Sequence, residues 1–279
     1  MANKIAILNF KGGVGKTTTA INLSAALVQA GKKVLLVDVD AQCDTSKTLG
    51  FKEGDGNTLY DAIMDETYQV PIPVYHHRTG IDFVPSSSTM SKAAEIIISR
   101  MRREYILYTL LKDVEKSYDY ILIDCPPNRT IINNNAMCAV DYVIIPVDGG
   151  AYATDGMAVL SDYLAQVKKL LNDKIELLGI VFTRHEKNLR LVNHNVEEIE
   201  SVFPNHTFNT KISKCAKVAE SQKFHKTIFE YARYCDAALD YKKMAKEIIE
   251  ATRNEPNCLE YRFLQDPFCP DVFFFHEVY

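Results

Sequence analysis

A cluster of glycines followed by lysine and threonine provides the first recognisable chemistry in this sequence. Residues 12–18 read Gly-Gly-Val-Gly-Lys-Thr-Thr and follow a β-rich run at residues 4–9. Without side chains in the way, backbone N–H groups can point at phosphate oxygens, and a helix start adds partial positive charge. Such a loop predicts a nucleoside triphosphate site formed by Gly12, Gly13, Val14, Gly15, Lys16, Thr17 and Thr18.

Two residues in the loop carry the reactive groups, and two others depart from the ordinary pattern. We expect Lys16 to reach the β- and γ-phosphates and the Thr17 hydroxyl to bind Mg²⁺. Phe10 occupies the position where G-x-x-x-x-G-K-[ST] has its first glycine, and Lys11 adds a second lysine. Lys11 is either a solvated surface charge or a second cation for the phosphates.

Acidic residues end two apolar runs. Asp38 and Asp40 close the run at residues 33–39, and Asp124 closes the run at residues 120–124. The second arrangement is that of a Walker B motif, in which the acid holds Mg²⁺. Asp124 is therefore the predicted metal residue. Asp38 is either a second residue near the metal or a carboxylate that fixes the loop after its strand.

Apolar runs alternate with helical patterns along the chain, which predicts an α/β fold. Such strands are typical of a single doubly wound, mostly parallel sheet with helices on both faces, whose ligands lie at the carboxyl ends of the strands. We expect one P-loop domain over residues 1–253 and an aromatic, proline-rich extension over residues 254–279. The expected strands are residues 4–9, 33–39, 81–84, 120–124, 142–147 and 177–183, and the expected helices are 16–30, 91–116, 154–171, 191–203 and 235–252.

Composition excludes several classes of protein. The formal net charge of −4 and pI of about 6.0 provide no global field for nucleic acid or anionic lipid, so such binding needs a local patch. The seven cysteines form no C-x-x-C pair, which argues against a zinc knuckle or a disulfide framework. No signal peptide or run of membrane-spanning length is present. We therefore expect a cytoplasmic protein with reduced thiols.

The motifs resemble those of the ParA/MinD ATPases, whose deviant phosphate loop reads KGGxGKT. The match begins at Lys11 and includes the D-C-P-P sequence that starts at Asp124. The resemblance implies ATP and Mg²⁺ as cofactors. It also implies that Lys11 reaches the nucleotide of a partner chain in an ATP-sandwich dimer, and that Asp40 positions the attacking water. The implied catalytic residues are Lys11, Lys16 and Asp40. Ala41 replaces the proline that usually follows this aspartate.

Segments 141–160 and 208–220 resemble ParA more than MinD. The resemblance implies that Ser213 and Lys214 lie beside the adenine, with Ser213 in place of a proline. It also implies a DNA-binding surface formed by Lys187, Arg190, Lys214 and Lys217. The prolines and acids of residues 261–279 disfavour the basic amphipathic membrane helix of MinD relatives. The aromatic residues of this tail either pack on the body or dock a partner.

The resulting functional prediction is a ParA-like ATPase for plasmid or chromosome partition. It would dimerise around ATP, bind DNA non-specifically on the nucleoid, and hydrolyse ATP faster with a ParB-like partner. Membrane is not an expected partner. Two alternatives stay open: a MinD-like membrane-cycling ATPase and a ParA-like positioning scaffold for a protein cargo.

Overall fold

The computed structural model describes residues 2–150, 153–186, 189–253, 260–265 and 273–278. Contacts within the chain divide it into two units, Met1–Glu247 and Ile248–Tyr279. The predicted boundary after residue 253 lies next to residues 254–259, which are outside the described part of the chain, and it stays a prediction.

Seven strands among the described residues form one sheet in the first unit. Their order is β3-β4-β2-β5-β1-β6-β7, and all neighbouring pairs are parallel except β3 with β4 at one edge. The predicted α/β fold is therefore confirmed. The strands are β1 (Asn3–Ile7), β2 (Val34–Asp38), β3 (Tyr75–His76), β4 (Asp82–Val84), β5 (Tyr120–Asp124), β6 (Tyr142–Val147) and β7 (Glu176–Phe182).

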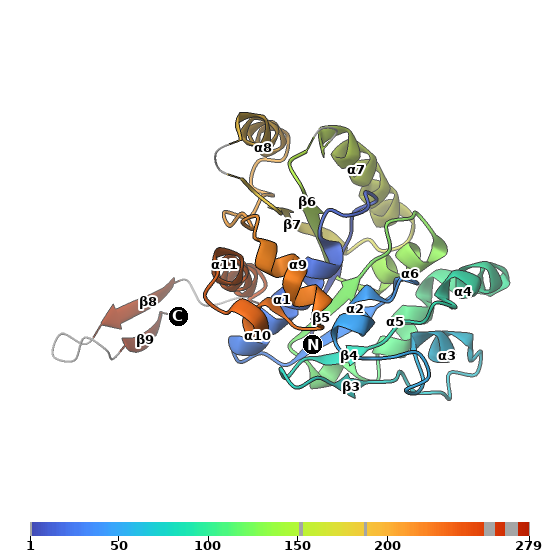
Figure 1. The fold of residues 1–279 in the computed structure, drawn as a ribbon. Coiled ribbons are helices and arrows are strands. Elements are labelled where there is room, and N and C mark those ends of the chain that lie inside the picture. The colour runs from blue at the N-terminus through green and yellow to red at the C-terminus, as the bar shows by residue number, and fades with distance from the viewer. Residues whose placement is uncertain (1, 151–152, 187–188, 254–259, 266–272, 279) are drawn as a thin grey trace. The chain divides into compact units, whose positions relative to one another are not determined.

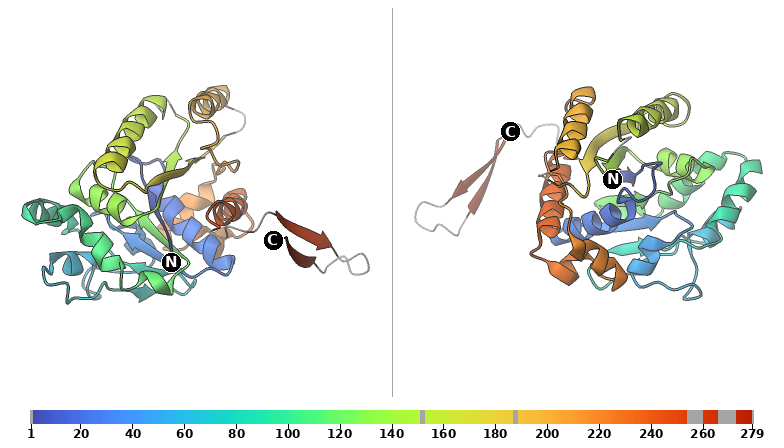
Figure 2. Two further views of the ribbon diagram at one scale, coloured as in Figure 1. Left: turned by 180° about the vertical axis from the view of Figure 1, so that it is seen from behind. Right: turned by 45° about the horizontal axis from the view of Figure 1, so that its top comes forward.

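Helices cover both faces of this sheet, as Figures 1 and 2 show. On one face, the helices formed by the C-terminal part of the first unit pack with the helix that follows the glycine loop. The other group of helices covers the opposite face. The helices are α1 (Lys16–Gln29), α2 (Asp44–Thr48), α3 (Leu59–Met64), α4 (Met90–Ile96), α5 (Ile106–Leu111), α6 (Ile131–Ala139), α7 (Ala153–Leu170), α8 (Arg190–Val202), α9 (Ala216–Lys223), α10 (Ile228–Ala232) and α11 (Asp236–Ala251).

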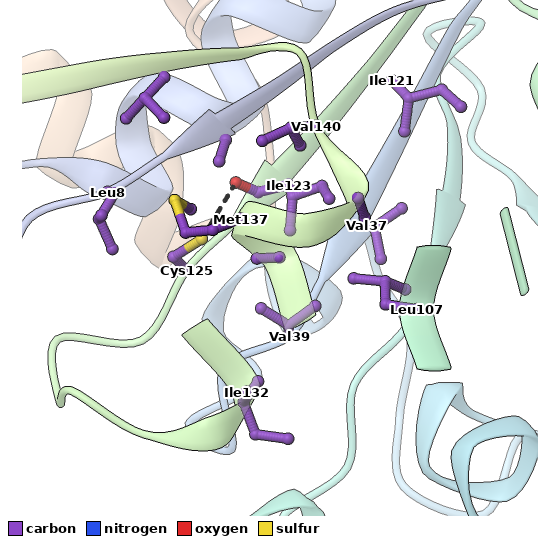
Figure 3. Packing of buried hydrophobic residues seen from close by; sticks show 14 of the residues in the cluster. Leu8, Val37, Val39, Leu107, Ile121, Ile123, Cys125, Ile132, Met137 and Val140 are labelled. Carbon is purple, nitrogen blue, oxygen red and sulfur yellow. Dashed lines mark hydrogen bonds between the residues drawn. The ribbon is translucent and has the colours of Figure 1, made fainter. Parts of the chain in front are cut away.

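The central strands are buried on both faces, which explains their nearly continuous apolar sequences. Every residue of β2 and β5 is buried. Figure 3 shows side chains of β2 and β5 packing with those of α5 and α6. Cys125 lies in this core with no exposed surface, and burial raises the pKa of its thiol well above the ordinary value. It is therefore a small buried residue and not an available nucleophile.

The structure differs from the sequence-based expectation mainly in short elements. Residues 51–80, where no helix or strand was predicted, contain α3 and β3. The helical stretch predicted at residues 91–116 is instead divided into α4, α5 and three short 3₁₀ turns, the last of which ends at Ser117. The second unit contains an antiparallel pair, β8 (Glu260–Gln265) with β9 (Phe273–Val278), which was not predicted. Across the described residues, no helix combines the length and the apolar character needed to cross a membrane.

Helix α1 is tied to the C-terminal part of the first unit by buried side chains. Asn22 is 2% exposed; its Nδ2 donates to the carbonyl oxygen of Thr18 (2.9 Å), and its Oδ1 accepts from the N–H of Ile228 (2.8 Å). The Thr19 hydroxyl also lies 3.5 Å from the hydroxyl of Tyr241. These bonds connect the helix that starts at the glycine loop with α10 and α11.

Replacing Asn22 with alanine should destabilise the fold. The substitution leaves the N–H of Ile228 buried without its acceptor, which costs on the order of 1–3 kcal/mol. Urea unfolding measures this as a lower midpoint with an unchanged slope. The exposed Asn57, changed to alanine, is the matched control and should shift the midpoint little. Equal shifts in the two variants would contradict the assigned role of Asn22.

Candidate nucleotide-binding site

The glycine loop joins β1 to α1 in a backbone conformation that only some residues can adopt. Gly13 and Gly15 have φ angles of +74° and +88°, in the left-handed region that side chains disfavour. A Cβ on Gly15 would make only ordinary van der Waals contact with Thr183, at 3.5 Å from its Cγ2, so the φ angle rather than lack of space favours glycine there. Helix α1 begins at Lys16, directly after the loop, so its first N–H groups and its positive end lie beside the loop.

Three hydrogen bonds hold the loop from outside. The Asn9 side chain donates to the carbonyl oxygen of Pro146 on β6 (2.8 Å) and accepts from the N–H of Lys11 (2.9 Å). The hydroxyl of Thr183, after β7, donates to the carbonyl oxygen of Val14 (2.8 Å). Neighbouring strands therefore fix the loop before any ligand binds.

Lys16 is buried, with 6% of its surface exposed, and its Nζ donates to the carbonyl oxygen of Lys11 (2.9 Å). Burial lowers the pKa of Lys16, while the nearby charges of Asp124 and Asp40 act in the opposite direction. The ammonium group thus sits next to the loop with few competing partners, where phosphate oxygens could replace its bond to Lys11.

Asp124 provides an incompletely bonded carboxylate at the end of β5. Its Oδ2 accepts from the Thr45 hydroxyl (2.7 Å), and Thr17 also donates a side-chain hydrogen bond to it. Within the described part of the chain, its buried Oδ1 has no hydrogen-bond partner. Burial raises the pKa of Asp124 to about 6. A buried oxygen of this kind, beside the Thr17 hydroxyl, suits an oxygen-binding cation such as Mg²⁺.

Asp38 lies beside Asp124, because β2 and β5 pair with these two residues in register. Its Oδ2 accepts from the N–H (2.9 Å) and hydroxyl (2.6 Å) of Ser46, and its Oδ1 accepts from the N–H of Asp40 (3.1 Å). Burial, followed by the charge of Asp124, raises the pKa of Asp38 to about 8. Both oxygens are engaged by the loop, which favours the loop-fixing role over direct binding of a metal.

Asp40 lies past the end of β2, where its carboxylate borders a cavity. A turn holds it: the Asp40 side chain accepts from the N–H of Gln42 (2.9 Å), and its carbonyl oxygen accepts from the N–H of Cys43 (3.0 Å). These bonds close the turn although Ala41 stands where a proline was expected. The carboxylate is partly exposed, so water can reach it.

The cavity has a volume of about 840 Å³ and is bounded by the glycine loop and Asp40. Its other walls come from distant segments, including the turn after β7 and helix α9. Among the further lining residues are Thr17, Thr18, Arg184, Ser213, Lys214, Ala216, Ala219 and Gln222. Residues from the first and last thirds of the chain therefore meet around one hollow of the size that small-molecule ligands occupy.

Lys11 points to a different neighbour from Lys16. Its Nζ lies 3.0 Å and 3.3 Å from the two carboxylate oxygens of Asp148, which follows β6, and its side chain is 44% exposed. Arg184 approaches the same carboxylate at 2.9 Å. Lys11 and Asp148 are not among the residues that line the cavity.

Comparison with known proteins identifies the family. A family described as an AAA domain matches residues 2–177. The chromosome partitioning protein ParA of Caulobacter vibrioides is 34% identical over 253 residues, covering 90% of this chain and 95% of the relative. The chain belongs to the ParA/MinD family of ATPases. The sporulation initiation inhibitor protein Soj of Bacillus subtilis is also 34% identical, over 89% of this chain and 98% of its own.

Solved structures of the family agree with the fold. A putative plasmid partition protein from Borrelia burgdorferi, bound to AMPPNP, superposes with a TM-score of 0.71 at 25% identity, covering 90% of this chain and 98% of the other. The family resemblance expected from the KGGxGKT loop is thereby confirmed.

The two residues predicted beside the adenine lie on the cavity wall but have other partners. The N–H and hydroxyl of Ser213 both donate to Asp240 on α11, at 3.0 Å and 2.7 Å. The Nζ of Lys214 pairs with Glu186 at 2.7 Å. The N–H of Ser213 is therefore already engaged, whereas no described residue donates a hydrogen bond to its carbonyl oxygen. The adenine role stays a prediction.

The predicted DNA-binding residues are only partly described. Lys187 lies outside the described residues, as does the side chain of Arg190. Lys214, which precedes α9, and Lys217, in the first turn of α9, are both exposed, and Lys214 is the one paired with Glu186. The DNA-binding surface stays a prediction.

Several site residues were missed from the sequence. Thr45 and Ser46 hold the two buried carboxylates, and Asp148 holds Lys11. Asp148 could have been found, because it ends an apolar run as Asp124 does. No local sequence pattern indicated Gln222, because the residue that it contacts at the cavity, Thr18, lies 204 positions away in the sequence.

The buried carboxyl groups of Asp38 and Asp124 predict a pH dependence in protein without metal or nucleotide. Their pKa values of about 8 and 6 exceed the ordinary value of 3.8. Between the ordinary and the raised pKa of each group, the folded state therefore binds more protons than the unfolded state. Their stabilising contribution is complete below pH 4 and is lost as the pH rises towards 8.

Asp124→Asn should remove its own contribution and lower the pKa of Asp38. Relative to wild type, the free energy of unfolding of this variant should rise by roughly 2–3 kcal/mol between pH 4 and pH 8. Urea titrations of both proteins at several pH values measure the difference, which cancels the contributions of other groups. A difference that does not change with pH would contradict the assignment.

Proposed function

We propose that this chain is a Mg²⁺-dependent ATP hydrolase that dimerises around ATP, binds DNA non-specifically and drives plasmid or chromosome partition. The observation that carries the proposal is the pairing of the rigid glycine loop and buried Lys16 with a buried, unsatisfied Asp124 oxygen. The proposed location is the cytoplasm, on the nucleoid when ATP is bound, and a ParB-like partner would stimulate hydrolysis.

The position of each residue indicates which part of the nucleotide it would bind. Lys16 leaves the carbonyl oxygen of Lys11 and neutralises the β- and γ-phosphates, while backbone N–H groups of the loop bind phosphate oxygens. Thr17 and Asp124 would hold Mg²⁺, which adds positive charge at the oxygens where negative charge develops. Asp38 keeps Asp40 in place through its hydrogen bond to the Asp40 N–H.

Asp40 is the proposed water-positioning residue. It borders the cavity, is partly exposed, and is held by its own turn. A carboxylate with these properties can accept a hydrogen bond from the attacking water and orient it towards the γ-phosphate.

Lys11 is proposed to act on the nucleotide of a partner chain. Its side chain is exposed, pairs with Asp148, and does not line the cavity of its own chain. A lysine in this position can exchange an exposed ion pair, which is worth little in water, for a phosphate across a dimer interface. The complete site would then require two chains.

The two lysines of the loop should differ when each is changed to glutamine. Lys16→Gln should lose ATP binding, because the buried ammonium group beside the loop is absent. Lys11→Gln should bind ATP but fail to dimerise with it. Equilibrium binding of a fluorescent ATP analogue and light scattering after gel filtration separate the two steps. ATP-dependent dimers of Lys11→Gln at wild-type concentrations would contradict the trans role.

DNA binding should depend on nucleotide and on salt. We expect the protein to retain non-specific duplex DNA with ATP, but to retain little with ADP or without nucleotide. With ATP, the DNA affinity should fall steeply between 50 and 200 mM salt, as it does for proteins that contact DNA phosphates. Lys217→Gln should weaken binding and reduce the salt slope, whereas the exposed Lys33, changed to glutamine, is the control. Equal retention in all three nucleotide states would contradict ATP-switched DNA binding.

A further inference from the structure

One hydrogen bond inside the cavity joins the glycine-loop helix to helix α9. The Nε2 of Gln222 donates to the Thr18 hydroxyl oxygen at 2.8 Å, across 204 positions of sequence. Both side chains are partly buried and both line the cavity. The bond is thus placed where a bound nucleotide would meet it.

The direction of this bond sets what the Thr18 hydroxyl can do. A hydroxyl has one proton to donate and two lone pairs that accept. Because the amide of Gln222 donates to the oxygen, the Thr18 proton remains available to an acceptor on the cavity side. Thr18 stands in the first turn of α1, beside the glycine loop, where phosphate oxygens are the expected acceptors.

We propose that Gln222 is a positioning residue that holds the Thr18 hydroxyl as a donor to bound nucleotide and couples nucleotide binding to helix α9. The inference rests on the proposed ATP site. It adds a residue outside the phosphate loop that senses the nucleotide without being required to contact it. Chains of hydrogen bonds strengthen one another, so a phosphate acceptor on Thr18 tightens the bond from Gln222.

Helix α9 has one side at the cavity and exposed lysines elsewhere, so a change in its hydrogen bond to Thr18 can affect the exposed charges that it carries. Ala216, Ala219 and Gln222 line the cavity, whereas Lys217 and Lys223 are exposed, and neither has an ion pair recorded within the described residues. Tightening the Gln222 bond steadies the helix that presents these two charges. The second link of α1 to this region, through Asn22, is buried away from the cavity and is complete without nucleotide.

A double-variant cycle tests the coupling. Gln222→Met keeps the length of the side chain but removes the donor, and Thr18→Val removes the hydroxyl. We expect each change to weaken binding of a fluorescent ATP analogue roughly five- to tenfold, the value of one hydrogen bond. The double variant should bind no more weakly than Thr18→Val alone, because the two residues act through one bond. Multiplying effects would overturn the proposal.

Hydrogen exchange of the α9 amides provides a readout that a purely structural role would not change. ATP should slow their exchange in wild type and in Thr18→Ser, which keeps the hydroxyl, but not in Gln222→Met. Gln166→Met, the same substitution at an exposed position on α7, is the control and should behave as wild type. ATP-induced protection of α9 that persists in Gln222→Met would overturn the proposal.

The outcomes separate this inference from the proposed function. If the wild-type chain does not bind the ATP analogue, the proposed function fails. If wild type binds it and the effects of the two substitutions multiply, only the role of Gln222 fails. Thermal unfolding of each variant identifies any loss of binding that comes from misfolding.

Discussion

Two carboxyl groups forced together at the carboxyl ends of β2 and β5 organise this molecule. Asp38 and Asp124 pair in register and are fully buried, so both cannot be charged without compensation. Ser46 and Thr45 donate to them, which draws the loop after β2 against β5. The loop brings Asp40 to the cavity, and one Asp124 oxygen remains for a cation. Burying two neighbouring carboxyl groups costs free energy, and the positive charge of a metal ion bound at this position would offset that cost.

The positive groups beside these acids divide by exposure. Lys16 is buried next to the glycine loop and lines the cavity of its own chain, while Lys11 is exposed and pairs with Asp148. The same short loop therefore presents one lysine inward and one outward. That division is the basis of the proposed ATP-controlled dimer, in which the outward lysine would reach a phosphate bound to the partner chain.

The sequence was sufficient for six of the seven strands of the sheet and for the acidic residues at the ends of β2 and β5, but not for the two-residue edge strand β3. Buried parallel strands have a recognisable apolar run, and Asp40 and Asp124 stand at the ends of such runs, while the glycine motif identifies Lys16. Short helices such as α2 and α3 were missed because five or six residues give too little periodicity. Ser213 was assigned by resemblance, yet its N–H is bound by Asp240, a contact between distant segments that no local pattern encodes. Gln222 was missed for the same reason, because only the folded chain brings α9 to Thr18.

Mixing two inactive variants tests most directly whether the finished site belongs to two chains. In a mixed dimer of Lys11→Gln and Asp40→Ala, the Lys11→Gln chain keeps its own Asp40 and receives Lys11 from its partner. The account predicts that ATP hydrolysis in the mixture rises well above the activity of either variant alone. If Lys11 instead acts within its own chain, neither site of the mixed dimer is complete. A mixture no more active than its components, with mixed dimers shown to form, would contradict the account.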